Sequence, residues 1–99
     1  MNERRVVLAP EAADDLMELY DWVAVQASPS VAMAYLERVE AFCQRLRLGS
    51  ERGHVRSDVR PGLRSMGFER RLTVAFTVEE ETVTVLRVFT AGRNWETSF

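Results

Sequence analysis

Two long segments of the chain repeat apolar residues every three or four positions, which is the spacing of an amphipathic helix. Across residues 11–27 one face is acidic and the opposite face carries Ala12, Leu16, Leu19, Tyr20 and Val23. From residue 30 to about residue 48 a second stripe runs through Tyr35, Leu36, Val39, Phe42, Cys43 and Leu46. Ser28 and Pro29 lie between the stripes, and Gly49 follows as a C-cap. The pattern predicts two antiparallel helices joined by a short turn.

Short runs of β type flank this helical pair. The first is Arg4–Leu8, directly before the first helix. The others are Leu63–Glu69, the clearly alternating Arg71–Val78, and Val83–Thr90, which is apolar on both faces except at Arg87. The element order β-α-α-β-β-β predicts an α+β fold in one domain, residues 1–99. We expect the helical hairpin to cover one face of a small, mainly antiparallel four-stranded sheet.

The composition, 46% hydrophobic and 28% charged, is that of an ordinary globular domain, with no apolar run near the ~20 residues of a membrane span. The N-terminal apolar run is also too short for a signal peptide. We therefore expect a cytoplasmic protein without membrane contact. Cys43 and His54 are the only cysteine and histidine, which argues against a disulfide, a zinc site or any cofactor. Cys43 is interpreted as a buried small hydrophobe.

Charge is distributed unevenly along the chain. Residues 1–42 contain 3 arginines and 8 acids, whereas residues 43–71 contain 8 arginines and 3 acids. The basic stretch includes residues 49–62, a polar segment with Gly53 and Pro61 that predicts a loop. Arginine forms bidentate contacts with carboxylates and phosphates, so this stretch fits a surface for nucleic acid or an acidic protein. Pairing with the chain's own acidic helix explains it equally well.

Four stretches, taken in order, resemble the ParE-type toxins of the RelE/ParE superfamily. They are LAPEAADDL at residues 8–16, the hairpin turn Ser28-Pro29, the PGLR sequence at residues 61–64, and VLRVFTAGRNW at residues 85–95. Together they span nearly the whole chain. No single stretch is specific, but the ordered set with these gaps is.

The resemblance implies the toxin of a type II toxin–antitoxin pair. Its partner would be a cognate antitoxin whose flexible C-terminal segment wraps the toxin. The N-terminal part of such antitoxins is usually a ribbon-helix-helix, ParD-like DNA-binding dimer. Operator DNA would then be contacted only through the complex. Direct DNA binding by this chain is the least favoured interpretation, because residues 45–67 lack the aromatic side chains of stacking modules.

Members of the RelE/ParE superfamily differ in the cellular target on which they act. RelE-like members cleave messenger RNA on the ribosome and typically place a Tyr or His near the chain's end as acid or base. No Tyr or His follows His54 here, which leaves Glu69, Arg64 and Arg87 as a possible base and phosphate clamp. ParE-like members instead resemble poisons of DNA gyrase, which need a binding surface rather than a proton-transfer pair. We therefore predict a gyrase inhibitor with no catalytic residue, and a ribosome-dependent endoribonuclease remains the alternative.

Two binding surfaces follow from these considerations. The expected target-binding residues are Arg87, Arg93 and Trp95. For Trp95, packing against the sheet and anchoring on the target remain equally open. The expected antitoxin-binding residues combine apolar side chains at the edge of the helical hairpin with arginines of the loop: Trp22, Val25, Met33, Arg56 and Arg60.

Overall fold

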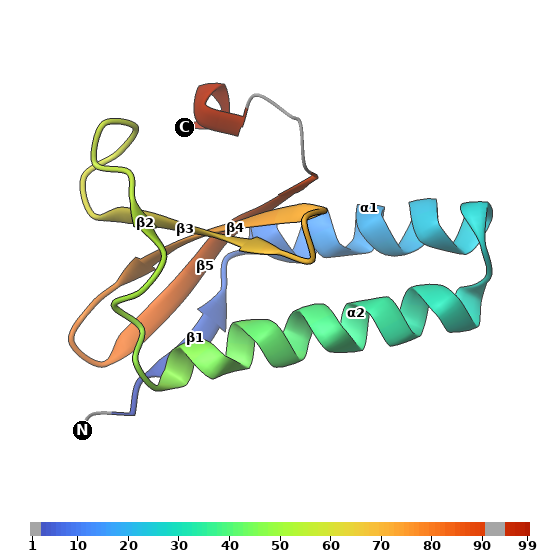
Figure 1. The fold of residues 1–99 in the computed structure, drawn as a ribbon, viewed down its shortest axis with the longest axis horizontal. Helices are drawn as coiled ribbons and strands as arrows, with labels where there is room; N and C mark the ends of the chain where they lie inside the picture. Colours follow the sequence, from blue (N-terminus) through green and yellow to red (C-terminus); the bar gives the residue numbers. More distant parts are fainter. Residues whose placement is uncertain (1–2, 91–94) are drawn as a thin grey trace.

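A computed structural model describes residues 3–90 and 95–99 of the chain. A helical hairpin covers one face of a small mixed sheet (Figure 1). In chain order the elements are β1 (Arg5–Leu8), α1 (Pro10–Gln26), α2 (Pro29–Gln44), the 3₁₀ turn η1 (Arg45–Arg47), β2 (His54–Val55), β3 (Leu63–Phe68), β4 (Leu72–Val78), β5 (Thr82–Thr90) and the 3₁₀ turn η2 (Trp95–Ser98). The predicted α+β class is confirmed.

The helix boundaries follow from local chemistry. Ser28 accepts a hydrogen bond from the backbone N–H of Val31 at 3.2 Å, and Pro29 follows it at the first helical position. The α-helical part of α2 ends at Gln44, earlier than the pattern predicted, because the last turn tightens into η1. Gly49 then reverses the chain at φ +62°, a conformation that glycine adopts without a Cβ clash.

The sheet has five strands rather than the four predicted, in the order β1-β5-β4-β3-β2. β1 runs parallel to β5, and every other neighbouring pair is antiparallel. The additional strand, β2, lies within the segment predicted as a loop, and its two residues pair with Ser65 and Arg64. Two residues carry no periodicity, so β2 could be identified only from its pairing with β3.

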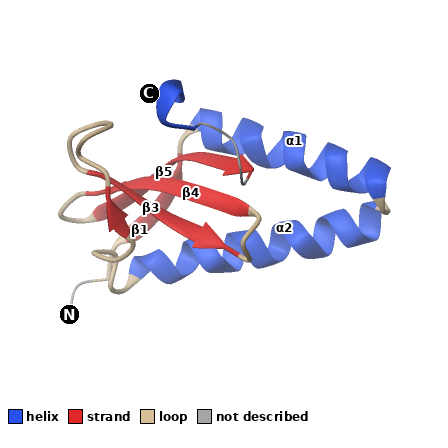
Figure 2. Cartoon of the chain, turned by 45° about the horizontal axis from the view of Figure 1, so that its top comes forward, coloured by secondary structure: helices blue, strands red, loops and turns tan. Residues whose placement is uncertain are grey.

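The sheet separates two hydrophobic cores of unequal size. The larger core lies between the helices and the sheet and includes Leu16, Val39, Phe76 and Val85. Cys43 is buried in it, and burial raises the pKa of its thiol to about 11. The smaller core lies on the opposite face, built from Leu63, Ala75, Phe89 and Trp95. Figure 2 shows the C-terminal turn η2 lying apart from α2, on the other side of the sheet. Within the described residues, no helix is long and apolar enough to cross a membrane.

Candidate functional site

A groove of about 930 Å³ runs between the helical hairpin and one end of the sheet. One wall comes from the facing sides of α1 and α2, and the other comes from the β3–β4 turn and the last residues of β5. The residues that line it are Asp15, Glu18, Leu19, Trp22, Val23, Gln26, Ala27, Val31, Tyr35, Arg38, Arg70, Arg71, Leu72, Val88 and Thr90. We call this region the groove.

Tyr35 is the polar exception among the groove's buried apolar residues. Its side chain is only 7% exposed, and Leu72 and Val88 are buried in the same core. The Tyr35 hydroxyl has no hydrogen-bond partner within the described part of the protein. Burial, reinforced by Glu69, raises the pKa of Tyr35. Burying a hydroxyl without a hydrogen bond is unfavourable, so the groove contains one unsatisfied polar group, the Tyr35 hydroxyl.

The β3–β4 turn brings charge to the rim of the groove. Glu69 and Arg70 occupy its two central positions with φ of 49° and 59°, a left-handed pair that usually requires Asn or Gly. Arg38 of α2 donates two hydrogen bonds to the Glu69 carboxylate, at 3.0 and 3.2 Å. These bonds lower the pKa of Glu69. Arg70 and Arg71 are exposed and form no ion pair with any described residue.

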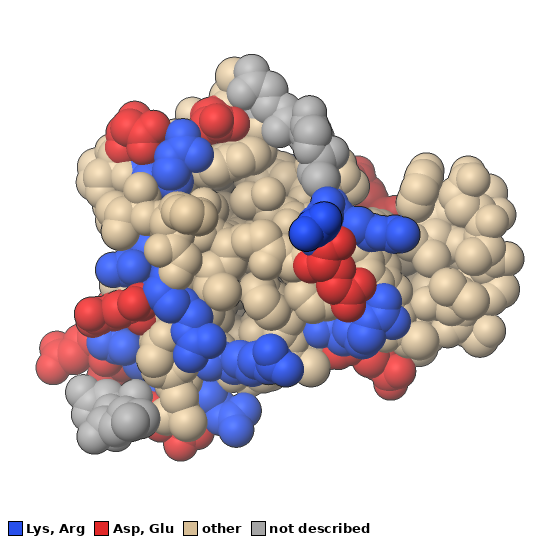
Figure 3. Space-filling model, in the orientation of Figure 1, with Lys and Arg blue, Asp and Glu red and all other residues tan. Residues whose placement is uncertain are grey.

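The end of the helical hairpin is free of charge. No charged residue occurs from Trp22 to Leu36, although Trp22, Val25 and Met33 are 62%, 82% and 52% exposed. Figure 3 shows charged side chains gathered over the β3–β4 turn, with the uncharged end of the hairpin beyond them. Of the three apolar residues predicted to bind an antitoxin, Trp22 lines the groove, whereas Val25 and Met33 lie elsewhere on the hairpin.

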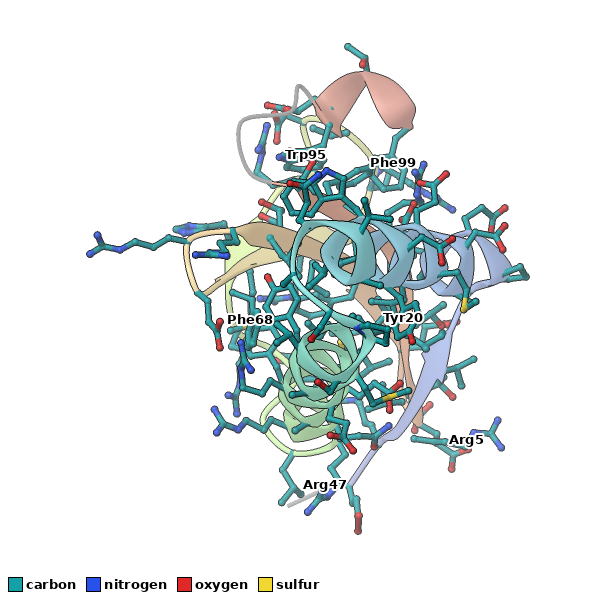
Figure 4. All side chains as sticks on the ribbon, turned by 90° about the vertical axis from the view of Figure 1, so that its right-hand side faces the viewer. Arg5, Tyr20, Arg47, Phe68, Trp95 and Phe99 are labelled. Atoms are coloured by element: carbon teal, nitrogen blue, oxygen red, sulfur yellow. The ribbon has the colours of Figure 1, made fainter. Side chains whose placement is uncertain are left out.

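A second cluster lies on the opposite face of the sheet. Trp95 is 9% exposed and stacks on Phe89 with ring centroids 5.8 Å apart, while Phe99 meets both rings edge-on. The guanidinium of Arg56 lies 5.0 Å from the centre of the Trp95 ring and forms ion pairs with Asp58 and Glu96. We call Phe89, Trp95, Phe99 and Arg56 the C-terminal cluster, of which Figure 4 labels Trp95 and Phe99. Trp95 therefore packs against the sheet.

Residues assigned from sequence to two different surfaces meet in this cluster. Arg56 was predicted to bind an antitoxin and Trp95 to bind the target, yet their side chains stack on each other. Arg60 is exposed in the same loop. Arg93, the third residue predicted to bind the target, lies outside the described residues.

Arg87 is tied to the first helix. Its guanidinium donates to both oxygens of Asp15, at 2.8 and 2.9 Å, and the backbone N–H of Val88 donates to the same carboxylate at 2.9 Å. β1 ends at Leu8, so beyond it Asp15 supplies the acceptor that a neighbouring strand would have offered to β5. Asp15 could not be identified from the sequence, because an acid on a polar helix face gives no sign of a partner 72 residues away.

The possible ribonuclease residues do not share a face. Arg64 pairs with Phe76 of the larger core, whereas Arg87 pairs with Ala75 of the smaller core. Glu69 is held by Arg38 in the turn at the far end of β3. His54 is exposed on β2, beside the Arg64 end of β3. The described residues therefore bring no base together with these two arginines. They also contain no cluster of three or more metal ligands.

The chain is similar in sequence and in fold to known proteins. Residues 6–95 match the family description "ParE toxin of type II toxin-antitoxin system, parDE". The chain belongs to the ParE toxin family. Toxin ParE3 of Caulobacter vibrioides is 31% identical over 90 residues, which cover 91% of this chain and 89% of that protein. These matches confirm the resemblance noted in the sequence.

The fold is also that of a solved ParE-containing system. A structure titled "Chromosomal ParDE TA system from P. aeruginosa" superposes with a TM-score of 0.79 at 23% identity, covering 90% of this chain and 97% of that one. This likeness shows a shared fold along most of the chain, and the family match makes the chain a ParE toxin of a type II toxin–antitoxin system.

Proposed function

We propose that this ParE-family chain inhibits DNA gyrase and that a cognate antitoxin, of ParD-like ribbon-helix-helix type, neutralises it. The observation that carries the gyrase proposal is the C-terminal cluster. The cluster lies on the face of the sheet that the helices leave open. There Trp95 stacks on Phe89, Arg56 lies over the Trp95 ring, and the turn η2 packs against the sheet. Trp95 is 9% exposed, so it supports this surface from beneath, whereas the stacked Arg56 side chain remains partly exposed and is of a residue type often found as an energetic anchor of protein interfaces. Such a surface suits inhibition by binding.

The alternative, cleavage of ribosome-bound messenger RNA, has less support. A ribonuclease must hold a base and a phosphate-binding cation close to one reacting phosphate. Glu69, Arg64 and Arg87 lie on different parts of the sheet, and two of the three are already engaged by other side chains.

The decisive experiment incubates the purified chain with DNA gyrase and supercoiled plasmid, beside a parallel reaction with ribosomes and messenger RNA. We expect gyrase-dependent cut DNA to accumulate and the RNA to stay intact. Cut messenger RNA with no trapped DNA breaks would replace this proposal with the ribonuclease. His54, Arg64 and Glu69 would then be the residues to mutate.

The target-binding residues Arg87, Arg93 and Trp95 remain part of the proposal. Deleting residues 93–99 should abolish DNA trapping, and Trp95→Phe, which keeps an aromatic ring on Phe89, should separate loss of contact from loss of packing. Arg5→Glu, on the exposed strand β1, is the matched surface control. Full trapping by a natively folded deletion variant would exclude a role for the C-terminal segment.

The antitoxin arm of the proposal rests on the hairpin and the arginine-rich loop. We expect Arg60→Glu to weaken antitoxin binding measured by titration, and unchanged affinity would argue against the loop. Because Arg56 stacks on Trp95, Arg56→Glu should be assayed for both antitoxin affinity and DNA trapping. An effect on trapping alone would reassign Arg56 from the antitoxin surface to the target surface.

A further inference from the structure

Three arginines, Arg45, Arg52 and Arg64, lie where the end of α2 meets the start of β3, and we call them the basic face. Figure 3 shows arginine side chains gathered over this end of α2. We propose that the basic face binds the phosphate backbone of duplex DNA. The inference goes beyond the proposed inhibition of gyrase and does not depend on it. In a complex with gyrase, the same face would supply a contact with the DNA that the enzyme cuts.

Hydrogen bonds to main-chain carbonyl groups hold two of these arginines next to each other. The Arg52 guanidinium donates to the carbonyl oxygens of Gly49 and Leu48, at 2.6 and 3.0 Å. Nη1 of Arg64 donates to the carbonyl oxygen of Arg52 at 3.4 Å. Arg45 begins η1, and its own carbonyl oxygen accepts a hydrogen bond from the Leu48 N–H. The three residues therefore occupy neighbouring positions, and two of their guanidinium groups are already fixed, which lowers the entropic cost of binding.

The positive charge of the basic face is not cancelled within the chain. Residues 43–71 contain 3 acids, and each of them forms an ion pair with an arginine outside the face: Glu51 with Arg4, Asp58 with Arg56, and Glu69 with Arg38. Among the described residues, no carboxylate forms an ion pair with Arg45, Arg52 or Arg64. Carbonyl groups accept hydrogen bonds but carry no net charge, and each guanidinium has further N–H groups to donate. The face can therefore bind an anion.

The surroundings of the basic face favour duplex phosphates over other anions. The core of a protein interface is apolar, yet of the large apolar residues described as exposed only Leu48 and Val55 fall between residues 45 and 64. Residues 45–67 also lack Phe, Tyr and Trp for stacking on unpaired bases. The sequence disfavoured direct DNA binding on that ground, but stacking is needed for single strands and not for the backbone of a duplex. Arginines on a rigid surface are sufficient for duplex phosphates.

Carboxylates limit the face on one side. A hollow of about 450 Å³ adjoins Arg64, and its lining residues are Arg4, Glu51, Gly62, Arg64, Val78, Glu79 and Glu80. Three carboxylates in this lining would repel a phosphate inside the hollow. The duplex should therefore lie across Arg45 and Arg52 and contact Arg64 only at the rim of the hollow.

The experiment measures binding of the purified full chain to a short fluorescent DNA duplex of mixed sequence, by anisotropy over a range of salt concentrations. Contacts with three phosphates predict a slope of about −2.7 in log affinity against log salt concentration, which is roughly a fortyfold loss over a fourfold rise in salt. Arg45→Gln should reduce the slope by about 0.9 and weaken binding roughly tenfold at low salt, because it removes one phosphate contact. Arg45 is exposed and has no ion pair among the described residues, so this change breaks no ion pair of the fold.

A pair of double variants controls for net charge. Arg45→Gln/Arg52→Gln should abolish most of the salt-dependent binding, whereas Arg5→Gln/Arg70→Gln loses the same charge from β1 and from the β3–β4 turn and should stay within about threefold of the wild type. Arg52→Lys keeps the charge of the face and should also stay within about threefold. Thermal unfolding of each variant verifies that it is folded.

Three results would overturn the inference. The first is a wild-type chain that shows no salt-dependent binding to the duplex. The second is Arg45→Gln with unchanged affinity and unchanged slope. The third is tighter binding to single-stranded RNA, or to polyglutamate of equal charge, which would assign the face to one of those partners. Gyrase is absent from this assay, so the DNA-binding face and the proposed gyrase inhibition can each fail without the other.

Discussion

Removing the Asp15 carboxylate should markedly destabilise the chain, because this one carboxylate accepts three hydrogen bonds from β5. Asp15→Ala leaves Arg87 without its bidentate partner and the Val88 N–H without its acceptor. The Asp15 side chain is 9% exposed and that of Arg87 is 23% exposed, so water replaces these bonds only in part. The lost acceptor contributes about 1–2 kcal/mol. The unpaired Arg87 contributes about 1–2 kcal/mol, below the ~3–5 kcal/mol of a fully buried pair because of its exposure.

The expected decrease in the free energy of unfolding is thus about 2–4 kcal/mol, a large fraction of the ~5–15 kcal/mol typical of small domains. Urea denaturation followed by circular dichroism measures it directly. Asp15→Asn, which keeps one acceptor oxygen, should lose about half as much. Asp14→Ala, exposed at the neighbouring position of α1, should stay within ~0.5 kcal/mol.

A double-mutant cycle isolates the ion pair from the backbone bond. Asp15→Ala combined with Arg87→Ala should show a coupling of about 1–2 kcal/mol, because each single variant already removes the same pair. The reasoning would be refuted if Asp15→Ala cost less than ~1 kcal/mol in a protein with native circular dichroism. That result would mean that another acceptor reaches the free edge of β5.

Three further outcomes are expected from stability measurements. Gly53→Ala should lower the free energy of unfolding by about 2–4 kcal/mol, because φ is +82° there and a Cβ would lie 2.5 Å from the Ser65 carbonyl oxygen. Gly62→Ala is the matched control, since φ is +77° but no atom lies near the added Cβ, and it should lower the free energy of unfolding by about 1 kcal/mol. Ser28→Ala should cost about 1 kcal/mol by removing the N-cap of α2. Because burial raises the pKa of Cys43 to about 11, the unfolded thiol ionises first as pH rises above 9, so stability should fall by about 2–3 kcal/mol between pH 9 and 11. Cys43→Ala should remove that part of the pH dependence.

The sequence predicted the elements whose residues follow a regular period. Both helices and the strands β3 to β5 appeared with boundaries within a few residues, because their apolar positions repeat along a face that the core buries. The two-residue strand β2 escaped detection because it exists only through its pairing with Arg64 and Ser65. The left-handed conformation of Glu69 and Arg70 was equally hidden, since neither residue type favours it.

The binding surfaces were harder to predict because they join distant parts of the chain. The groove gathers residues from α1, α2, the β3–β4 turn, β4 and β5, and nothing in a linear pattern indicates that Tyr35 lies near Arg71. Charge segregation drew attention to the arginine-rich stretch but did not distinguish Arg56, which stacks on Trp95, from Arg71, which has no ion-pair partner among the described residues. Pairing within the fold decides which arginines are available to another molecule.

The parallel pairing of β1 with β5 also sets when the protein can acquire its shape during synthesis. Arg5 leaves the ribosome well before its sheet partner Thr82 has been added to the chain. Until β5 has been synthesised, the first strand has no neighbour and the helical hairpin has no complete sheet to cover. Closing so long a loop makes this step slow compared with local helix formation. At the usual ~5–20 residues per second the nascent chain passes several seconds without its final sheet. The surfaces built on β5, including the stacking of Trp95 on Phe89, therefore form only after that interval.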